Sequence, residues 1–280
     1  MIWIVTTFEE KKTLLHPQGV IDLRRTYLGD SIQVLIVNKE EDLSFISIKD
    51  IVLVRSKYKW LIDKLSRSGQ VIGESPATYS YDLDKEKLKA RISHYHVLTP
   101  KHYSRLSLPE EPFSVFVKPL SWGDSLGIDE QSICHTREEV YDKLSSIRQF
   151  GFSMIEEYVP GRDCTVGVIK LGECYHTAGL LIESPFNILD QETKSKDLER
   201  YYPMNDPHIE EIAKKVFDIV EAKCYGRVDF RITPDGKPYV IEINLCPGLS
   251  YSGYMSRAFA AKGISYENMI RMIFETRKNA

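Results

Sequence analysis

The stretch GRVDFRITPDGKPYVIEIN, residues 226–244, decides the fold of the region around it. Its centre, Asp235-Gly236, favours a two-residue hairpin turn between two strand-like runs. A turn at these two residues places Asp229 directly opposite Glu242 on the neighbouring strand. We therefore predict an antiparallel hairpin in which two carboxylates face each other across the strands.

The same register gives the hairpin one polar face and one apolar face. Arg227 pairs with Asn244, and Arg231 follows Asp229 at a spacing of two. Because side chains alternate between the faces of a strand, these groups join Glu242 on one face. The opposite face carries the apolar residues of a predicted core layer, which are Val228, Phe230, Ile232, Ile241 and Ile243.

Two carboxylates directly across a strand pair repel each other, so the polar face needs a compensating positive charge. Two sources of that charge are open. The guanidinium groups of Arg227 and Arg231 can supply it as a plain lattice of ion pairs. Alternatively, the oxygen atoms of Asp229, Glu242 and Asn244 form the all-oxygen ligand set that Mg²⁺ prefers. We favour the metal site.

From about residue 113 the chain reads as strands joined by tight turns. The expected strands are 115–118, 154–159, 165–170, 228–232 and 239–244. Asp206-Pro207 supplies an N-cap and a first-turn proline, and apolar residues recur after it at helical spacing. Ser265 similarly caps a final helix. This part of the chain is therefore predicted to be α+β.

The first part of the chain has a different pattern of predicted strands and helices. Apolar runs at 1–6, 33–38, 50–55 and 70–72 alternate with a helical stretch at 58–68, a pattern typical of a small α/β domain. A further helix is expected to contain residues 84–89. The predicted domains are 1–79, 80–160 and 161–280.

Composition excludes several classes of protein. Apolar residues make up 42% and charged residues 28% of the 280 residues, which is the balance of a globular protein. The formal net charge of −3 offers no broad basic face, so we predict no nucleic-acid partner. No apolar run approaches the roughly 18 residues that span a bilayer, so we predict no membrane segment.

The cysteines and the start of the chain bear on the cellular compartment. The five cysteines form no CxxC pair, and residues 1–5 lack the basic segment of a signal peptide. An odd number of unpaired cysteines is typical of reduced, mostly buried thiols. We therefore expect a cytoplasmic protein.

Several motifs resemble, in order and in spacing, the ATP-grasp domain of D-alanine–D-alanine ligases over roughly residues 80–280. They are FVKPLSWGDSLG at 116–127, IEEYVPGRDCTV at 155–166, RVDF at 227–230 and EINLCPG at 242–248. The resemblance implies an ATP-grasp fold of class α+β, in which two subdomains clasp ATP. The short α/β domain at residues 1–79 would precede it.

Position by position, the resemblance implies a site for phosphoryl transfer. The metal ligands that it implies, for two Mg²⁺ ions with Mn²⁺ as a substitute, are Asp229, Glu242 and Asn244. Arg227 would stabilise the transferring phosphoryl group. Ser125 of the glycine-containing loop and Lys194 of a mobile loop are the other implied catalytic residues.

The resemblance also implies the residues that bind the nucleotide. Residues 156–159 would hydrogen-bond adenine, Asp163 would take the ribose hydroxyl groups, and two lysines would contact the phosphates. The full implied set is Lys89, Lys118, Gly123, Asp124, Ser125, Glu156, Glu157, Tyr158, Val159, Asp163 and Arg231. The chain thus contains a complete set of nucleotide and metal residues.

The chain departs from the family where D-alanine is recognised. The N-terminal glycine-rich motif, with its serine and glutamate, is missing from residues 1–30. Asp124 and Gly253 stand where serines are usual, and Ser195 stands at a tyrosine position. Arg231 replaces an apolar residue that would face the nucleotide. We therefore predict a ligase that is not a true D-alanine–D-alanine ligase.

The implied function is an ATP- and Mg²⁺-dependent carboxylate–amine ligase that forms an amide bond through an acyl phosphate and releases ADP and phosphate. Its substrates would be a small-molecule carboxylate and an amine, either amino acids or peptides. One alternative is a ligase that adds an amino acid to a peptide or carrier-protein tail. Another is a nucleotide-binding module without catalysis, which Asp124 in the phosphate loop favours. For the oligomeric state, we leave open a homodimer.

Overall fold

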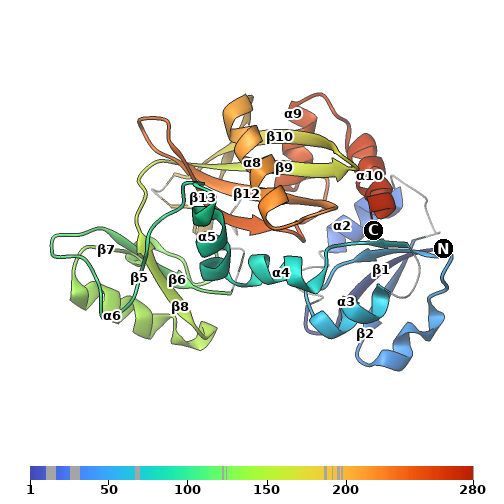
Figure 1. Ribbon diagram of the computed structural model, residues 1–280, viewed down its shortest axis with the longest axis horizontal. Helices are drawn as coiled ribbons and strands as arrows, with labels where there is room; N and C mark the ends of the chain where they lie inside the picture. The colour runs from blue at the N-terminus through green and yellow to red at the C-terminus, as the bar shows by residue number, and fades with distance from the viewer. Residues whose placement is uncertain are drawn as a thin grey trace.

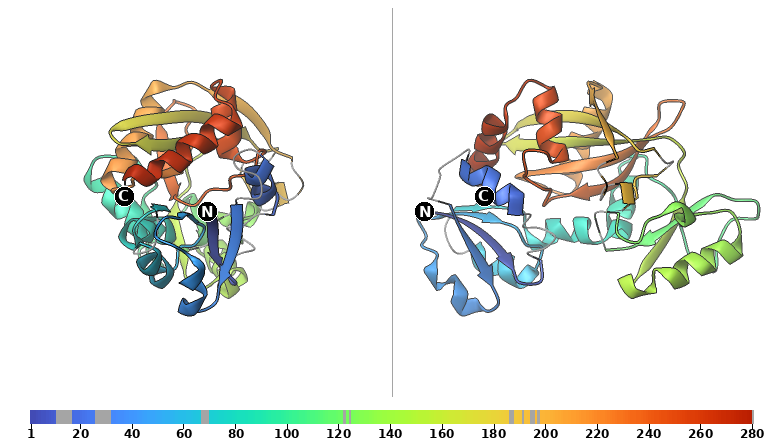
Figure 2. Two further views of the ribbon diagram at one scale, coloured as in Figure 1. Left: turned by 90° about the vertical axis from the view of Figure 1, so that its right-hand side faces the viewer. Right: turned by 180° about the vertical axis from the view of Figure 1, so that it is seen from behind.

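The described residues form three sheets that follow one another along the chain (Figure 1). The computed structural model describes residues 1–10, 17–25, 32–66, 70–121, 123, 125–185, 188–190, 192–193, 196 and 198–279. The first sheet lies at one end of an elongated molecule and the second at the other end, with the third alongside both (Figures 1 and 2). The second sheet forms one lobe of the molecule, and the third sheet, with the first packed against it, forms the other lobe.

The first sheet is parallel and has the order β2-β1-β3-β4. Its strands are β1 (Ile2–Thr7), β2 (Ile32–Val37), β3 (Ile51–Val54) and β4 (Gln70–Ile72). The connections contain α2 (Pro17–Leu23), the 3-10 helix η3 (Glu40–Phe45) and α3 (Lys59–Leu65). The predicted strands are confirmed, and the helix predicted at 58–68 is confirmed over Lys59–Leu65; residues 67–68 lie outside the described residues. Helical crossovers cover a parallel sheet, which explains why its strands are nearly continuous apolar runs.

Two helices lead from the first sheet to the second, namely α4 (Pro76–Leu83) and α5 (Lys85–His94). Ser75 caps α4, and Asp84 caps α5 by accepting the N–H of Lys87. The second sheet is antiparallel, with the order β5-β8-β6-β7. Its elements are β5 (His102–Tyr103), β6 (Val115–Pro119), η4 (Glu130–Ser132), β7 (Ile133–Cys134), α6 (Arg137–Ser146), η5 (Arg148–Phe150) and β8 (Ser153–Glu157).

The third sheet is antiparallel, with the order β11-β10-β9-β12-β13. Its elements and those that follow it are β9 (Arg162–Leu171), β10 (Cys174–Glu183), β11 (Arg200–Met204), α8 (Pro207–Ile219), β12 (Tyr225–Ile232), β13 (Pro238–Asn244), α9 (Tyr254–Ala261), α10 (Tyr266–Glu275) and η6 (Thr276–Asn279). The helix starts at Asp206 and Ser265 are confirmed, because both side chains accept backbone N–H groups there. The prediction missed β10 and β11.

The hairpin of β12 and β13 confirms the predicted opposition of Asp229 and Glu242 but not the predicted turn. Residues 233–237 form a longer loop, and the register shifts by one residue between Asp229 and Phe230. The shift offsets the longer loop, so the polar pairs keep the predicted register. The shift also moves Ile241 from the predicted core face to a pocket wall, next to Glu242.

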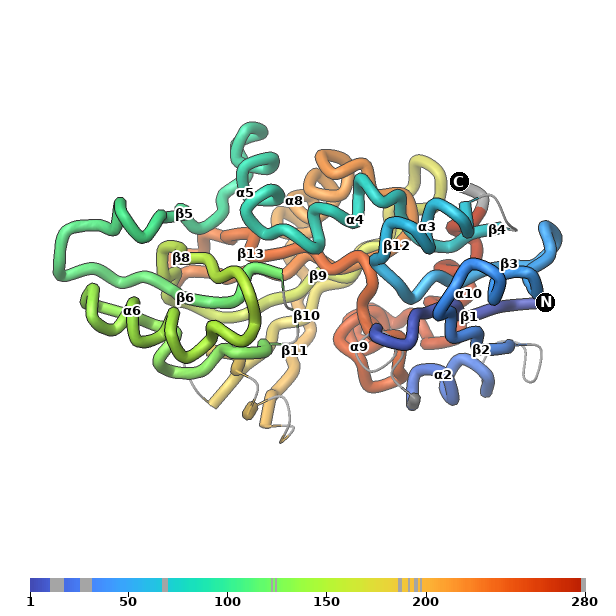
Figure 3. The backbone as a smooth tube through the Cα atoms, turned by 90° about the horizontal axis from the view of Figure 1, so that it is seen from below, coloured from blue at the N-terminus to red at the C-terminus, as the bar shows by residue number. Residues whose placement is uncertain are grey.

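The buried cores explain how the lobes are built. Val52 and Val54 of β3 pack in one cluster with Val166 of β9 and Val228 of β12. The second sheet has a separate cluster around Val115, Val117, Val140 and Leu144. The first and third sheets therefore share a core, as their contact in Figure 3 illustrates. The domain boundaries at 79/80 and 160/161 stay a prediction.

Two further features bear on the predicted location of the protein, namely its helices and its cysteines. In the part of the chain that the structure describes, no helix is both long and apolar enough to cross a membrane. All five cysteines are free thiols, four of them buried and Cys174 exposed. The cytoplasmic location and the homodimer stay predictions.

Candidate active site

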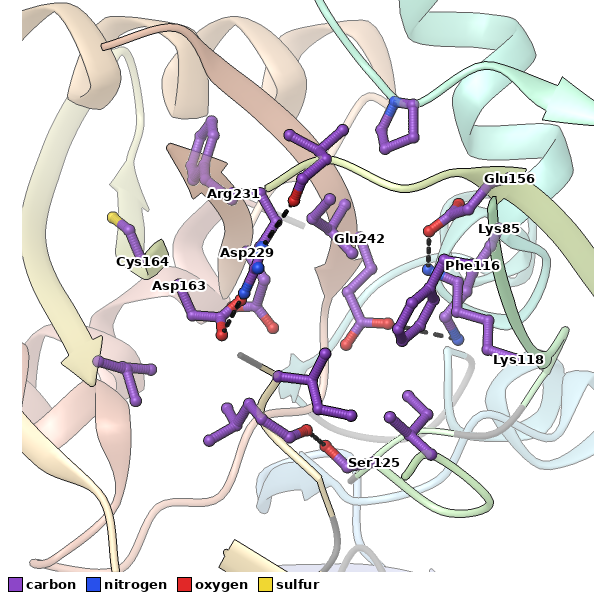
Figure 4. A pocket seen from close by; sticks show the side chains of 18 of the residues that line it. Lys85, Phe116, Lys118, Ser125, Glu156, Asp163, Cys164, Asp229, Arg231 and Glu242 are labelled. Atoms are coloured by element: carbon purple, nitrogen blue, oxygen red, sulfur yellow. Dashed lines mark hydrogen bonds and ion pairs between the residues drawn. The ribbon is translucent and has the colours of Figure 1, made fainter. Parts of the chain in front are cut away.

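A pocket with an empty volume of about 1000 Å³ lies between the second and third sheets (Figure 4). Its walls come from β6 and β8 of one lobe and from β9, β12 and β13 of the other. The start of α5, the loop after β6, the end of β10 with the segment that follows it, and α9 also contribute to the walls.

Asp229 and Glu242 contribute the two carboxylates of one wall. Arg227 Nε lies 3.1 Å from Asp229 Oδ1, and Thr165 Oγ1 donates to the same oxygen at 2.6 Å. Lys85 Nζ lies 3.3 Å from Glu242 Oε2. Each carboxylate therefore has a cationic partner, as the ion-pair interpretation expects for Asp229. The partner of Glu242 is a lysine of α5 that the sequence analysis did not consider.

Arg227 is held from two sides. Its Nη2 donates to Asp229 Oδ2 at 3.2 Å, and its guanidinium carbon lies 4.9 Å from the centre of the Tyr254 ring. Burial alone would lower the pKa of Arg227, but the carboxylates of Asp229 and Glu242 raise it above the ordinary value. Arg227 is therefore a permanent, oriented cation on the pocket wall.

Asn244 lies on the same strand face as these groups but outside the pocket wall. It pairs with Arg227 in the sheet register, as predicted. Its Oδ1 accepts the backbone N–H of Cys246 at 3.0 Å, in a turn that follows β13. The amide oxygen therefore has a protein donor that a metal ion would have to share or replace.

A buried charge cluster backs the other wall. Lys118 Nζ lies 2.7 Å from Glu156 Oε1, and Lys89 Nζ lies 3.1 Å from Glu156 Oε2. Burial alone would raise the pKa of Glu156, but the two ammonium groups lower it below the ordinary value. Burial lowers the pKa of Lys89 to about 8, against the opposing effect of Glu156. Glu156 therefore holds both lysines by ion pairs, which engage both of its carboxylate oxygens.

The two lysines of α5 differ in position. Lys85 lines the pocket, where its Nζ also donates to the Leu120 carbonyl oxygen at 3.3 Å. Lys89 does not line the pocket. Its Nζ donates to Thr99 Oγ1 at 3.0 Å. One helical turn separates the two, so α5 presents a lysine to the wall one turn before the predicted Lys89.

The end of β8 and the segment that leads to β9 form the hinge of the pocket, and Glu157, Tyr158 and Val159 of this hinge line the wall. Arg231 Nη1 donates to Asp163 Oδ2 at 2.9 Å and Arg231 Nε to the Val159 carbonyl oxygen at 3.2 Å. The ring of Tyr158 stacks on that of Phe116 at 6.4 Å. One end of the pocket is thus partly aromatic.

The loop after β6 contributes Gly123 and Ser125 to the pocket. Ser125 has a φ of 56° and donates its hydroxyl to the Leu189 carbonyl oxygen at 2.6 Å. This bond brings the loop into contact with the segment after β10, as expected for two elements that close one site. Asp124 and Lys194 lie outside the described residues.

The structure brings together most of the residues singled out from the sequence. Those on the pocket wall are Lys118, Gly123, Ser125, Glu156, Glu157, Tyr158, Val159, Asp163, Arg227, Asp229, Arg231 and Glu242. Wall residues that were not predicted from the sequence include Lys85, Phe116, Cys164 and Tyr254. Lys85 follows the helix cap Asp84, a signal that was available. Tyr254 carries no such signal, because only the packing of α9 brings it to Arg227.

The chemistry of the acidic wall fits a divalent cation. Two carboxylates face each other at paired positions, and the amide of Asn244 is on the same face of the strands. Hard oxygen donors of this kind suit Mg²⁺. Among the described residues, no group of three or more His, Cys, Asp or Glu side chains is placed to hold a metal. A cation here would therefore rely on the mixed carboxylate and amide set, together with phosphate oxygens.

Comparison with known proteins agrees with this geometry. A family model described as D-ala D-ala ligase C-terminus matches residues 87–275. The D-alanine–D-alanine ligase of Aquifex aeolicus is 26% identical over 265 residues, which cover 88% of this chain and 89% of that protein. The D-alanine–D-alanine ligase of Francisella tularensis subsp. tularensis is 27% identical over 203 residues, which cover 69% and 67%.

Solved structures give the same answer for the fold. The D-alanine–D-alanine ligase from Bacillus anthracis complexed with ATP superposes with a TM-score of 0.76 at 18% identity, covering 99% of this chain and 97% of that one. The VanG D-Ala:D-Ser ligase from Enterococcus faecalis gives 0.75 at 15%, covering 99% and 98%. At these identities the likeness concerns the fold, and the predicted ATP-grasp fold is confirmed.

The prediction that the chain is not a true D-alanine–D-alanine ligase is wrong. The family match spans most of the chain, and the relatives just described carry that name. The prediction depended on a missing N-terminal motif and on departures from the family pattern at Asp124, Ser195, Arg231 and Gly253. However, the N-terminal part of the chain contacts the loop after β13 directly, since Asp22 Oδ2 of α2 accepts the N–H of Tyr251 at 2.8 Å. Residues 229 apart in sequence meet here, which a motif comparison cannot detect.

Proposed function

The chain belongs to the D-ala D-ala ligase C-terminus family, and on that premise we propose that it joins two molecules of D-alanine. It is an ATP-dependent ligase that joins a carboxylate to an amine in an amide bond. The names of the relatives from Aquifex and Francisella support D-alanine as the substrate. A ligase acting on a protein tail and a module without catalysis are not favoured.

The observation that carries the proposal is that carboxylates and cations line the same pocket. Asp229 and Glu242 lie on the wall beside Arg227. Lys85 pairs with Glu242, and Lys118 lines the pocket from β6. In our proposal the lysines bind phosphate oxygens of ATP, and the acidic pair with Asn244 holds magnesium. When bound there, Mg²⁺ would offset the negative charge of the triphosphate.

The reaction then runs in two steps. An oxygen of the first D-alanine carboxylate attacks the γ-phosphorus, the bond to the β-phosphate oxygen breaks, and ADP leaves. The amine of the second D-alanine attacks the acyl phosphate carbon, so that a C–N bond forms, phosphate leaves and the amine releases a proton. Arg227 supplies fixed positive charge to the oxyanion, a contribution worth about 10²–10³ in rate.

The contact between Ser125 and Leu189 supports a further part of the proposal. It ties the loop after β6 to the segment after β10, over the end of the pocket where the phosphates would lie. Water would hydrolyse an acyl phosphate, so its exclusion matters for yield. We propose that these two segments keep water out while the intermediate exists.

The proposal is tested by measuring ADP release and the peptide product together. With D-alanine and Mg²⁺ we expect ADP release that matches D-alanyl-D-alanine formation by mass spectrometry. L-alanine is the stereochemical control, and D-serine tests the second position. Arg227→Met should retain ATP binding and lose turnover. Efficient ligation of a different pair, with no reaction of D-alanine, would remove D-alanine from the proposal.

A further inference from the structure

Arg231 ties the hinge of the pocket to strand β12. Its Nε donates to the Val159 carbonyl oxygen at 3.2 Å, and its Nη1 donates to Asp163 Oδ2 at 2.9 Å. Figure 4 shows the side chain between these two acceptors, and only 9% of the residue is exposed. One planar guanidinium therefore holds both the hinge backbone and a carboxylate of β9.

A second contact holds the same hinge. Gly161 has a φ of 153°, and a Cβ at this position would lie 2.1 Å from the carbonyl oxygen of Ile232. The hinge backbone therefore lies directly against β12, where no larger residue fits. Val159 and Gly161 are both held by neighbouring residues of one strand.

Asp163 is the group whose orientation depends most on Arg231. The two residues pair directly in the register of β9 and β12. The side chain of Asp163 is 23% exposed and that of Arg231 is 10% exposed, so the carboxylate faces the pocket while the guanidinium lies deeper. A carboxylate near a bound polyphosphate is repelled by it, and the ion pair compensates that charge.

We propose that Arg231 is a positioning residue that sets the preference of the site for a ribonucleotide. It turns the Asp163 carboxylate toward the hydroxyl groups of the ribose and fixes the hinge carbonyl of Val159. This inference rests on the proposed nucleotide site and extends it. Because two acceptors are bridged by one rigid fork, the point charge of a lysine cannot replace it.

The test measures both binding and turnover. Binding of a non-hydrolysable ATP analogue with Mg²⁺ is followed by calorimetry, and kcat and KM are determined for ATP, 2′-deoxy-ATP and 3′-deoxy-ATP. The variants are Arg231→Met and Arg231→Lys. The matched control is Arg271→Met, because Arg271 is exposed on α10.

For Arg231→Met we expect KM for ATP to rise about tenfold, the effect of one lost charge-assisted hydrogen bond, with a smaller change in kcat. The preference for ATP over the deoxy analogues should fall toward one. Arg231→Lys should show the same losses, and Arg271→Met should match the wild type. A merely structural role would lower stability without changing the preference for ribose.

Unchanged analogue binding and an unchanged ribose preference in Arg231→Met would overturn the proposal, as would full rescue by lysine. If Arg231→Met does not fold, Asp163→Asn keeps the shape of the side chain and must lose the ribose preference. A wild-type enzyme that fails to bind the analogue would instead overturn the nucleotide site itself. That outcome is distinct from binding that is indifferent to Arg231.

Discussion

Lys85 Nζ lies 3.3 Å from Glu242 Oε2, joining the first turn of α5 to strand β13 across the pocket. Together with the pair of Arg227 and Asp229, it gives each carboxylate of the acidic wall a cation. These two cations offset the repulsion between two carboxylates at directly opposed positions. A metal bound there must take over this compensation, which leads to the first prediction.

Replacing Glu242 by Gln should remove one metal ligand while keeping the shape of the strand. We expect kcat to fall by about 10²–10³, because charge on the transferring phosphoryl group loses its stabilisation. Half-saturation by Mg²⁺ should move to higher concentration in steady-state assays. Glu267→Gln, at an exposed position of α10, is the control. Unaltered magnesium dependence in Glu242→Gln would exclude Glu242 as a ligand.

Lys85 and Lys89 should respond differently to the same change. Lys85→Met removes a cation from the pocket wall, so we expect KM for ATP to rise at least about tenfold. The loss of unfolding free energy should be smaller than for Lys89→Met, because the partner of Lys85, Glu242, is partly exposed to water. Lys89→Met breaks part of a buried ion cluster, which typically costs about 3–5 kcal/mol. Urea unfolding and ATP kinetics on both variants distinguish them. The reverse pattern would make Lys89 the phosphate lysine.

The buried ammonium of Lys89 should give stability a specific dependence on pH. Its pKa is about 8 in the folded chain and 10.5 as the ordinary value, so the unfolded chain binds more protons between these values. Stability due to this group therefore rises with pH across that interval, by at most about 1.4 kcal/mol per pH unit. Below the lower value its contribution is constant.

This pH effect is isolated by subtracting the unfolding free energy of Lys89→Met from that of the wild type at each pH. The difference should be level below about pH 7 and should increase from pH 8 to 10.5, the interval between the folded and ordinary pKa values. Other lysines and tyrosines titrate in both proteins and cancel. A difference that decreases with pH would mean that burial does not lower the pKa of Lys89.

Tyr254 should contribute through its ring. The ring lies against the Arg227 guanidinium at 4.9 Å, and its hydroxyl donates to Glu199. Tyr254→Phe keeps the ring, so we expect a modest loss of kcat; Tyr254→Leu removes it and should cost about 0.5–2 kcal/mol, or up to thirtyfold in kcat. KM for ATP should change less. Equal kcat for the two variants would show that ring contact does not orient Arg227.

The hairpin shows how far sequence patterns reach. Period-two alternation predicted that Asp229 and Glu242 would oppose each other, and they do, although the loop is longer than the two residues expected. A one-residue shift in β13 restores the register. Such a bulge has no sequence signal of its own, so the position of Ile241 on the pocket wall was not predictable. The prediction also lacked strand β10, but that strand does have a sequence signal. Its residues Ala178, Leu180 and Ile182 are buried and alternate along the strand.

The sequence by itself determined the α+β class, the caps at Asp206 and Ser265, and the family resemblance carried by four motifs, because these depend on local spacing. Tertiary structure decided which lysine of α5 meets the pocket, that Tyr254 reaches Arg227, and that Asp22 contacts the loop after β13. These outcomes depend on how helices pack against sheets, and packing distances are not encoded by the periodicity of one segment. For the same reason, departures at single motif positions gave the wrong prediction that the chain is not a true D-alanine–D-alanine ligase.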